Sequence, residues 1–105
     1  MEPQNNHLPA EITGVVDKIA ELQKPYKIYL FSNKRGEKGK TSGFKLCVIA
    51  EHCERSEAER DIYLKVDSEV PFDIVLYTPA EWAELTVRKG SFAEKVAKTG
   101  ALVYG

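Results

Sequence analysis

The stretch that decides the fold is PFDIVLYTPAE, residues 71–81. Its first half is rich in large apolar and β-branched residues, which predicts a strand over residues 72–77. Thr78 and Glu81 then form a Ser/Thr-x-x-Glu helix start, and Pro79 stands at the first helical position, where proline is favoured. The stretch therefore predicts a strand that leads directly into a helix.

Asp73 interrupts the apolar run of this strand. A carboxylate inside a sheet is costly unless it is paired, hydrogen-bonded or coordinated to a cation. The alternative is that Asp73 lies on the solvent face of an edge strand. A period of two permits this, because Phe72, Ile74 and Leu76 then share the other face. Taken alone, the pattern favours the solvent-exposed position.

Helical and extended patterns alternate on both sides of this stretch. Ser56/Glu59 and Ser91/Glu94 repeat the same helix start, and Gly100 is a predicted C-terminal cap. The expected elements are a helix over residues 9–24, strands over 26–31 and 44–50, a helix from 56, the strand over 72–77, helices from 78 and 91, and a strand over 101–104. This order predicts an α/β (α+β) fold, a mixed β-sheet backed by helices.

Three further expectations concern the second strand, the loop before it and the domain boundary near the N-terminus. Residues 44–50 are almost continuously apolar, so we expect both faces of that strand to be covered. Residues 32–42 hold two glycines and four cationic side chains, which predicts a mobile basic loop. We expect one domain over residues 9–105, after a frayed or disordered N-terminus at residues 1–8.

The charge balance of the 105 residues is close to neutral, with 15 basic and 16 acidic side chains and a net charge of −1. This balance argues against general nucleic-acid binding, and no apolar run is long enough to span a membrane. The first seven residues lack a secretory signal pattern, and Cys47 and Cys53 cannot form a disulfide framework. We therefore expect a reduced, cytoplasmic protein.

Common catalytic and metal motifs are not matched. Gly39-Lys40-Thr41 resembles part of a phosphate loop, but Lys34 stands where the loop needs glycine, and a strand rather than a helix follows. Cys47, His52 and Cys53 lack the fourth ligand and the spacing of a structural zinc site. Neither cysteine has the flanking features of a catalytic nucleophile. The sequence does not exclude a catalytic Ser–His pair, because such residues meet in space and not in sequence.

Most of the chain, from Ile12 to Gly105, resembles the minimal nucleotidyltransferases of the DNA polymerase β superfamily. The residues that carry the resemblance are Leu30-Phe31, Arg35-Gly36-Glu37, Leu46 to Ala50, Asp73-Ile74-Val75-Leu76-Tyr77-Thr78-Pro79-Ala80-Glu81, Lys89-Gly90-Ser91-Phe92 and Leu102-Val103-Tyr104. The resemblance implies a nucleotidyltransferase-like fold. It also implies nucleotide binding at Ser32, Asn33, Lys34 and Arg35, where the family has a Gly-Ser loop.

The same resemblance implies a degenerate catalytic site. Where the family has an Asp-x-Asp pair of metal ligands, this chain has Gly43 and Lys45, so only Asp73 remains of three carboxylates. Magnesium prefers oxygen ligands, and phosphoryl transfer depends on such metal ions. We therefore expect no catalytic residues, no metal site and no cofactor. We also expect the Lys45 ammonium to pair with the Asp73 carboxylate.

These implications lead to three hypotheses on function. The first is a catalytically degenerate protein that acts as a partner-binding or regulatory module of toxin–antitoxin type, with a small helical HEPN-type protein as its partner. The second is an active metal-dependent nucleotidyl- or adenylyltransferase with a rearranged site, which would need magnesium. The third is a nucleotide sensor that binds without turnover.

Overall fold

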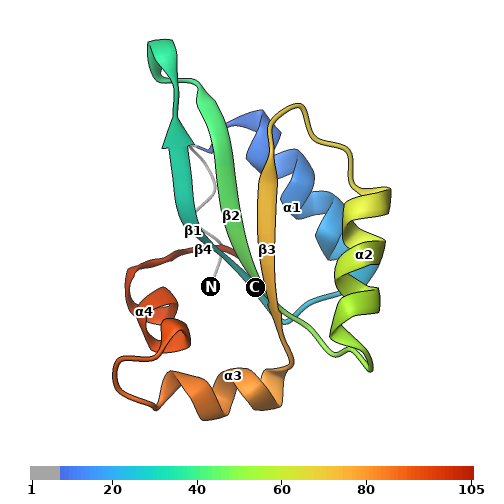
Figure 1. Cartoon of the computed structure of the whole chain (residues 1–105), viewed down its shortest axis with the longest axis vertical. Coiled ribbons are helices and arrows are strands. Elements are labelled where there is room, and N and C mark those ends of the chain that lie inside the picture. Colours follow the sequence, from blue (N-terminus) through green and yellow to red (C-terminus); the bar gives the residue numbers. More distant parts are fainter. Residues whose placement is uncertain (1–7) are drawn as a thin grey trace.

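The computed structural model describes residues 8–105 as a mixed four-stranded sheet with helices on both of its faces (Figure 1). The strands lie in the order β3-β2-β1-β4, with β2 and β3 parallel and the other neighbours antiparallel. The elements are α1 (Ala10–Gln23), β1 (Lys27–Arg35), the 3₁₀ turn η1 (Glu37–Gly39), β2 (Thr41–Ile49), α2 (Arg55–Lys65), β3 (Phe72–Tyr77), α3 (Pro79–Thr86), α4 (Phe92–Thr99) and β4 (Ala101–Tyr104). The α/β fold class predicted from the sequence is confirmed.

The larger core lies between one face of the sheet and helices α1 and α2. Alternate residues of each strand point to this face, as the period of two requires. The main members are Ile12, Val15, Val16 and Ile19 of α1, Ile62 of α2, and Ile28, Leu30, Phe44, Leu46, Val48, Ile74, Leu76 and Val103 of the sheet. The amphipathic pattern predicted for residues 9–24 is therefore the pattern that buries α1.

The opposite face of the sheet is covered only in part. Tyr29, Cys47 and Ile49 pack there with Val96 of α4 and Trp82 of α3. Figure 1 shows α3 and α4 at the end of the sheet that lies away from the β1–β2 hairpin. Residues 44–50 are buried on both faces except at Lys45, so the expected two-sided cover of this strand is confirmed over most of its length.

The basic loop expected over residues 32–42 is shorter than predicted. β1 continues to Arg35 and β2 begins at Thr41, so the turn holds only residues 36–40. Ser32 pairs with Lys45 and Lys34 pairs with Gly43, which gives these polar residues the backbone hydrogen bonds of a strand ladder. Local composition indicated a loop, but the ladder with β2 extends the strand.

The three predicted helix starts have three different outcomes. The Thr78 and Glu81 side chains form a complete capping box at α3. Ser91 accepts the Glu94 N–H, but the Glu94 carboxylate accepts the N–H of Gly90 rather than that of Ser91. The start predicted at Ser56 is wrong, because α2 begins one residue earlier at Arg55 and no side chain caps it.

The remaining boundaries agree closely with the predictions. Pro9 is the N-cap of α1, Gly100 is the C-cap of α4, and the last strand covers residues 101–104. Across residues 8–105, none of the helices combines the length and the apolar character that crossing a bilayer requires.

Candidate functional site

A β-bulge in β1 creates the polar end of the sheet. Leu30 pairs with Leu46 and Ser32 pairs with Lys45, so Phe31 is an extra residue on β1. The bulge shifts the alternation of the strand by one residue and brings Ser32 to the face that carries Lys45. Asp73 is the neighbour of Lys45 on the other side, in the parallel ladder of β2 and β3. Three neighbouring strands thus contribute one row of polar residues, Ser32, Lys45 and Asp73, across the part of this face that α3 and α4 leave open.

This row lies in a shallow pocket of about 250 Å³. Its lining includes five positions that the sequence singled out, namely Ser32, Lys34, Gly43, Lys45 and Asp73, together with Ser42, Phe44 and Pro71. Residues far apart in the sequence are thus brought together in one pocket. Ser42 and Pro71 were not expected from the sequence, since their place depends on the register of β2 with its two neighbours.

Two of the predicted nucleotide-binding residues lie outside this pocket. Asn33 pairs with Phe44, whose ring is part of the helix-side core, and the Asn33 side-chain oxygen is buried without a hydrogen-bond partner among residues 8–105. Arg35 is exposed and pairs with Thr41 at the end of the hairpin. Neither residue lines the pocket.

Lys45 and Asp73 do not form the direct ion pair that we expected. No contact within 4.0 Å joins their charged groups, although five other ion pairs occur among the described residues. Asp73 is exposed and Lys45 is partly exposed, so water solvates both charges and a direct pair would add little stability. The prediction of a direct pair is therefore wrong, even though the two residues are neighbours in the sheet.

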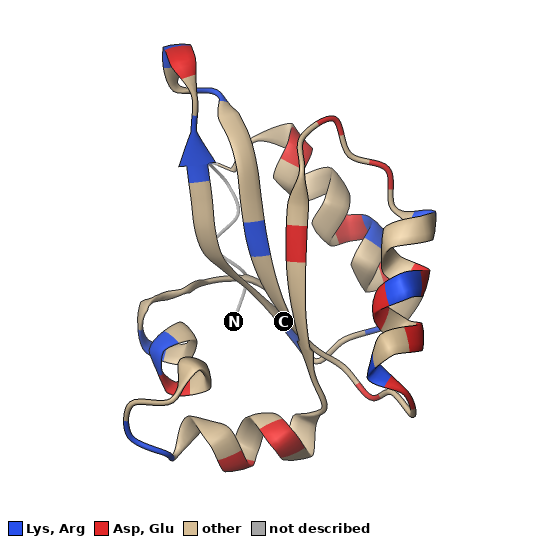
Figure 2. Ribbon diagram, in the orientation of Figure 1, with Lys and Arg blue, Asp and Glu red and all other residues tan. Residues whose placement is uncertain are grey.

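Basic charge gathers on the hairpin side of the pocket. Lys34, Arg35, Lys38 and Lys40 lie on or beside the turn, with Glu37 as the acidic residue among them. Figure 2 shows this hairpin projecting beyond the rest of the sheet, and a basic segment of β2 beside an acidic segment of β3. The pocket therefore lies next to a surface with excess positive charge.

The donor atoms of the pocket do not fit a magnesium ion. Asp73 is its one carboxylate, while Lys34 and Lys45 bring ammonium groups. Within residues 8–105 there is no group of three or more His, Cys, Asp or Glu side chains placed to hold a metal ion. A hard divalent cation takes oxygen ligands, and a neighbouring ammonium repels it.

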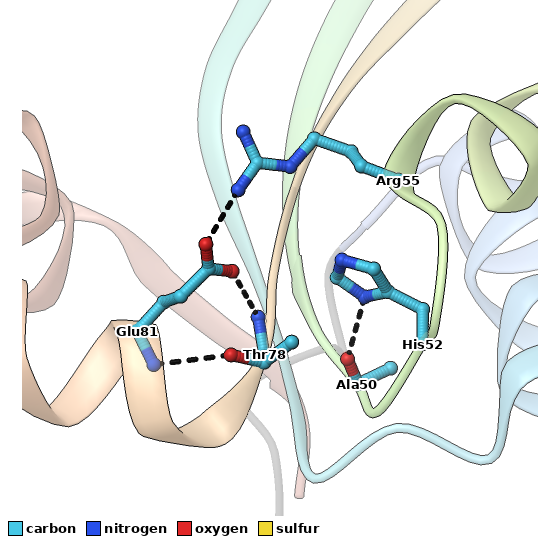
Figure 3. A network of polar contacts seen from close by, with 5 residues as sticks. All are labelled: Ala50, His52, Arg55, Thr78 and Glu81. Carbon is cyan, nitrogen blue, oxygen red and sulfur yellow. Dashed lines mark hydrogen bonds and ion pairs between the residues drawn. The ribbon is translucent and has the colours of Figure 1, made fainter.

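A second polar network lies at the carboxyl ends of the parallel strands (Figure 3). The Arg55 guanidinium donates to Glu81 Oε2 at 2.8 Å, and Glu81 Oε1 accepts the Thr78 N–H at 2.8 Å. His52 Nδ1 lies 3.0 Å from the Ala50 carbonyl oxygen. The Thr78 N–H is the main cause that lowers the pKa of Glu81, and Arg55 adds to it. The network joins the start of α2 to the start of α3.

The two cysteines lie in contrasting surroundings. Burial raises the pKa of the Cys47 thiol to about 12, which keeps it protonated and unreactive at neutral pH. Cys53 is exposed, in the turn after β2. Neither cysteine lines the pocket.

Comparison with known proteins gives no match: no protein-family model, no curated protein and no solved structure is significantly similar to this chain. What the pocket can do must therefore be argued from its own residues. Those residues offer two ammonium groups, one carboxylate and two hydroxyls on an open face of a sheet.

Proposed function

We propose that this protein is a non-catalytic binding module with a nucleotidyltransferase-like fold. The observation that carries the proposal is the composition of the row across the sheet, where Lys45 lies directly beside Asp73 and Gly43 precedes it on the same face. In a nucleotidyltransferase, carboxylates would stand at both of those positions. The position of all three residues in one pocket supports the resemblance, and their chemistry supports the loss of activity.

The loss follows from the role of metal ions in phosphoryl transfer. Divalent cations neutralise the phosphate charge and activate the attacking oxygen, and several carboxylates must hold them. Asp73 alone supplies one such ligand, and the Lys45 ammonium opposes a second positive charge beside it. A rearranged active site would need further carboxylates around Asp73, and the described residues of the pocket provide none.

We further propose that the module acts by binding a protein, with a small helical HEPN-type protein as the partner and a regulatory role of toxin–antitoxin type. The surface of the α3–α4 unit supports this. Val87 is 80% exposed and Phe92 is 42% exposed. Phe92 packs edge-to-face on Phe31 of β1, with ring centroids 5.1 Å apart. A helical partner would cover these apolar side chains and gain the free energy of burying them.

Incubation of the purified chain with labelled nucleotides, magnesium or manganese, and proteins from its host tests the catalytic part of the proposal. We expect no transfer of label. Transfer by the wild type that disappears in Asp73→Ala would establish the alternative, an active nucleotidyl- or adenylyltransferase.

Co-purification of the native chain from its host at low salt tests the binding part. We expect a helical partner in stoichiometric amount, and we expect Val87→Asp to release it. Leu64→Asp is the matched control, because Leu64 is a 75% exposed apolar residue of α2, away from the α3–α4 unit. Retention of the partner by Val87→Asp would move the interface elsewhere, and no partner at all would contradict the proposed binding role.

A further inference from the structure

We propose that the open pocket binds a phosphate-bearing anion directly, without a divalent cation, with Lys45 and Lys34 as its charged ligands. This inference rests on the proposed non-catalytic function, because it requires that no metal ion stands between Asp73 and the ligand. It assigns to the Lys45 ammonium, the neighbour of Asp73 in the sheet, the positive charge that a divalent cation would otherwise supply. The ligand class is a small polyphosphate, either free or as part of a nucleotide.

The charge of the pocket favours an anion. Two lysines and one aspartate line the pocket, and the adjoining hairpin adds Arg35, Lys38 and Lys40 against Glu37. Neither Lys34 nor Lys45 forms an ion pair within 4.0 Å with any described residue. Both ammonium groups are thus available to a ligand, and charge-assisted hydrogen bonds to phosphate are among the strong ones.

The place of Lys45 in the sheet makes it the central ligand. It is partly buried in the middle strand, flanked by Ser32 on β1 and by Asp73 on β3. The Ser32 hydroxyl forms no side-chain hydrogen bond among residues 8–105, so it is free to donate to the same anion. Ser42 differs, because its hydroxyl already donates to the Lys34 carbonyl oxygen at 3.2 Å.

The size of the pocket limits what it can enclose. A volume of about 250 Å³ lies below the roughly 300–1,000 Å³ of sites that bury a drug-sized molecule. Phosphate groups fit such a site, whereas the base and sugar of a nucleotide would extend out of it. The pocket therefore recognises the phosphates and leaves any attached group at the surface.

The effect of Asp73 on anion affinity distinguishes direct binding from binding through a metal ion. The Asp73 carboxylate repels an anion that binds directly, so Asp73→Asn should strengthen binding, by about fivefold for the loss of one like charge at partly solvated distance. In a metal-mediated site the same change removes the one carboxylate ligand and weakens binding. The direction of the effect distinguishes the two mechanisms.

The test is calorimetric titration of the full chain with inorganic diphosphate in EDTA, at fixed ionic strength. We expect saturable binding that Lys45→Ala weakens by about 10- to 100-fold, the loss of one charge-assisted hydrogen bond. Lys34→Ala should weaken it in the same direction. Lys95→Ala is the matched control, since Lys95 is an exposed lysine of α4, away from the pocket, and the variant carries the same change in charge.

Each outcome of the titration has a defined meaning. The absence of binding in EDTA, or an equal loss in Lys45→Ala and Lys95→Ala, overturns this inference and leaves the proposed function standing. Binding that needs magnesium and is weakened by Asp73→Asn overturns both. A parallel titration with ATP identifies the source of the phosphate, since equal affinities support a free polyphosphate and tighter binding of ATP supports a nucleotide.

Discussion

Lys45 and Asp73 are direct neighbours across the parallel strands β2 and β3, yet their charged groups stay more than 4.0 Å apart. Two opposite charges at adjacent positions of a sheet usually attract one another. Here both side chains reach solvent, and hydration of the two charges replaces most of the stabilisation that a direct ion pair would provide. Lys45 and Asp73 thus contribute to the charge of the pocket and add little to the stability of the fold.

The first prediction concerns the stability of this pair. Lys45→Met keeps the apolar stem and removes the charge, so we expect the free energy of unfolding to change by less than about 0.5 kcal/mol. Asp73→Asn should have an equally small effect. Urea denaturation of both variants and of the double variant measures the coupling. A loss of about 2 kcal/mol in each single variant, recovered in the double variant, would show a strong pair after all.

The second prediction compares one threonine and one serine, each of which begins a Ser/Thr-x-x-Glu pattern in the sequence. Thr78→Ala removes the capping box of α3 and should lower the free energy of unfolding by about 1 kcal/mol. Ser56→Ala is the control, because Ser56 lies within α2 and caps nothing. Urea denaturation checks both variants, and an equal loss at the two positions would contradict this description of the helix starts.

The third prediction concerns the reactivity of the thiols. With the pKa of Cys47 raised to about 12 by burial, its thiolate is scarce at pH 8, whereas Cys53 is exposed. A thiol-specific chromogenic disulfide should therefore titrate one thiol in the native protein and two in urea. Native Cys53→Ser should react only as fast as the protein opens. Immediate reaction of native Cys53→Ser would mean that Cys47 is accessible.

The fourth prediction is a loss of stability in acid. The pKa values of Glu81 and Glu94 are lowered in the folded chain, mainly by the N–H groups of Thr78 and Gly90. A carboxyl whose folded pKa lies below its unfolded value stabilises the fold above about pH 4.5, and that contribution is lost as the pH falls through the folded pKa. The urea concentration at the midpoint of unfolding should therefore decrease as the pH is lowered below about 4.5.

The matched variant for the acid limb is Glu81→Gln with Glu94→Gln. It lacks both carboxyl groups, so its urea midpoint should change less between pH 7 and pH 3 than that of the wild type. Identical acid dependence of the two proteins would show that other groups determine the loss.

Periodicity and capping patterns predicted most of the fold because they act locally. The burial of α1, the strand at residues 72–77 and the start of α3 all follow from residues within one turn or one pleat. One of the two failures has a long-range cause. The ladder with β2 extends β1 through its polar residues to Arg35, although its composition resembles a loop. The helix start at Ser56 failed because α2 begins one residue before it.

The residues of the candidate site were predicted only in part. The resemblance named Ser32, Lys34, Gly43, Lys45 and Asp73, and these five residues line one pocket. It also named Asn33 and Arg35, which lie elsewhere, because the bulge at Phe31 changes which residues of β1 reach the open face. A bulge depends on pairing with another strand, so the sequence of β1 alone does not reveal it.

The most direct test of the central claim is to restore the two carboxylates. The variant Gly43→Asp with Lys45→Asp would place them beside Asp73, and a Cβ at position 43 would approach only Pro71, at 3.4 Å or more, which is ordinary contact. The measurement is Mn²⁺ binding to the wild type and to this double variant. Binding is detected by calorimetry or by the loss of the free-ion spin signal. We predict no saturable binding to the wild type at millimolar Mn²⁺, and saturable binding to the double variant that Asp73→Asn abolishes. Saturable binding of Mn²⁺ to the wild type that is lost in Asp73→Asn would contradict the claim, because it would show a working metal site.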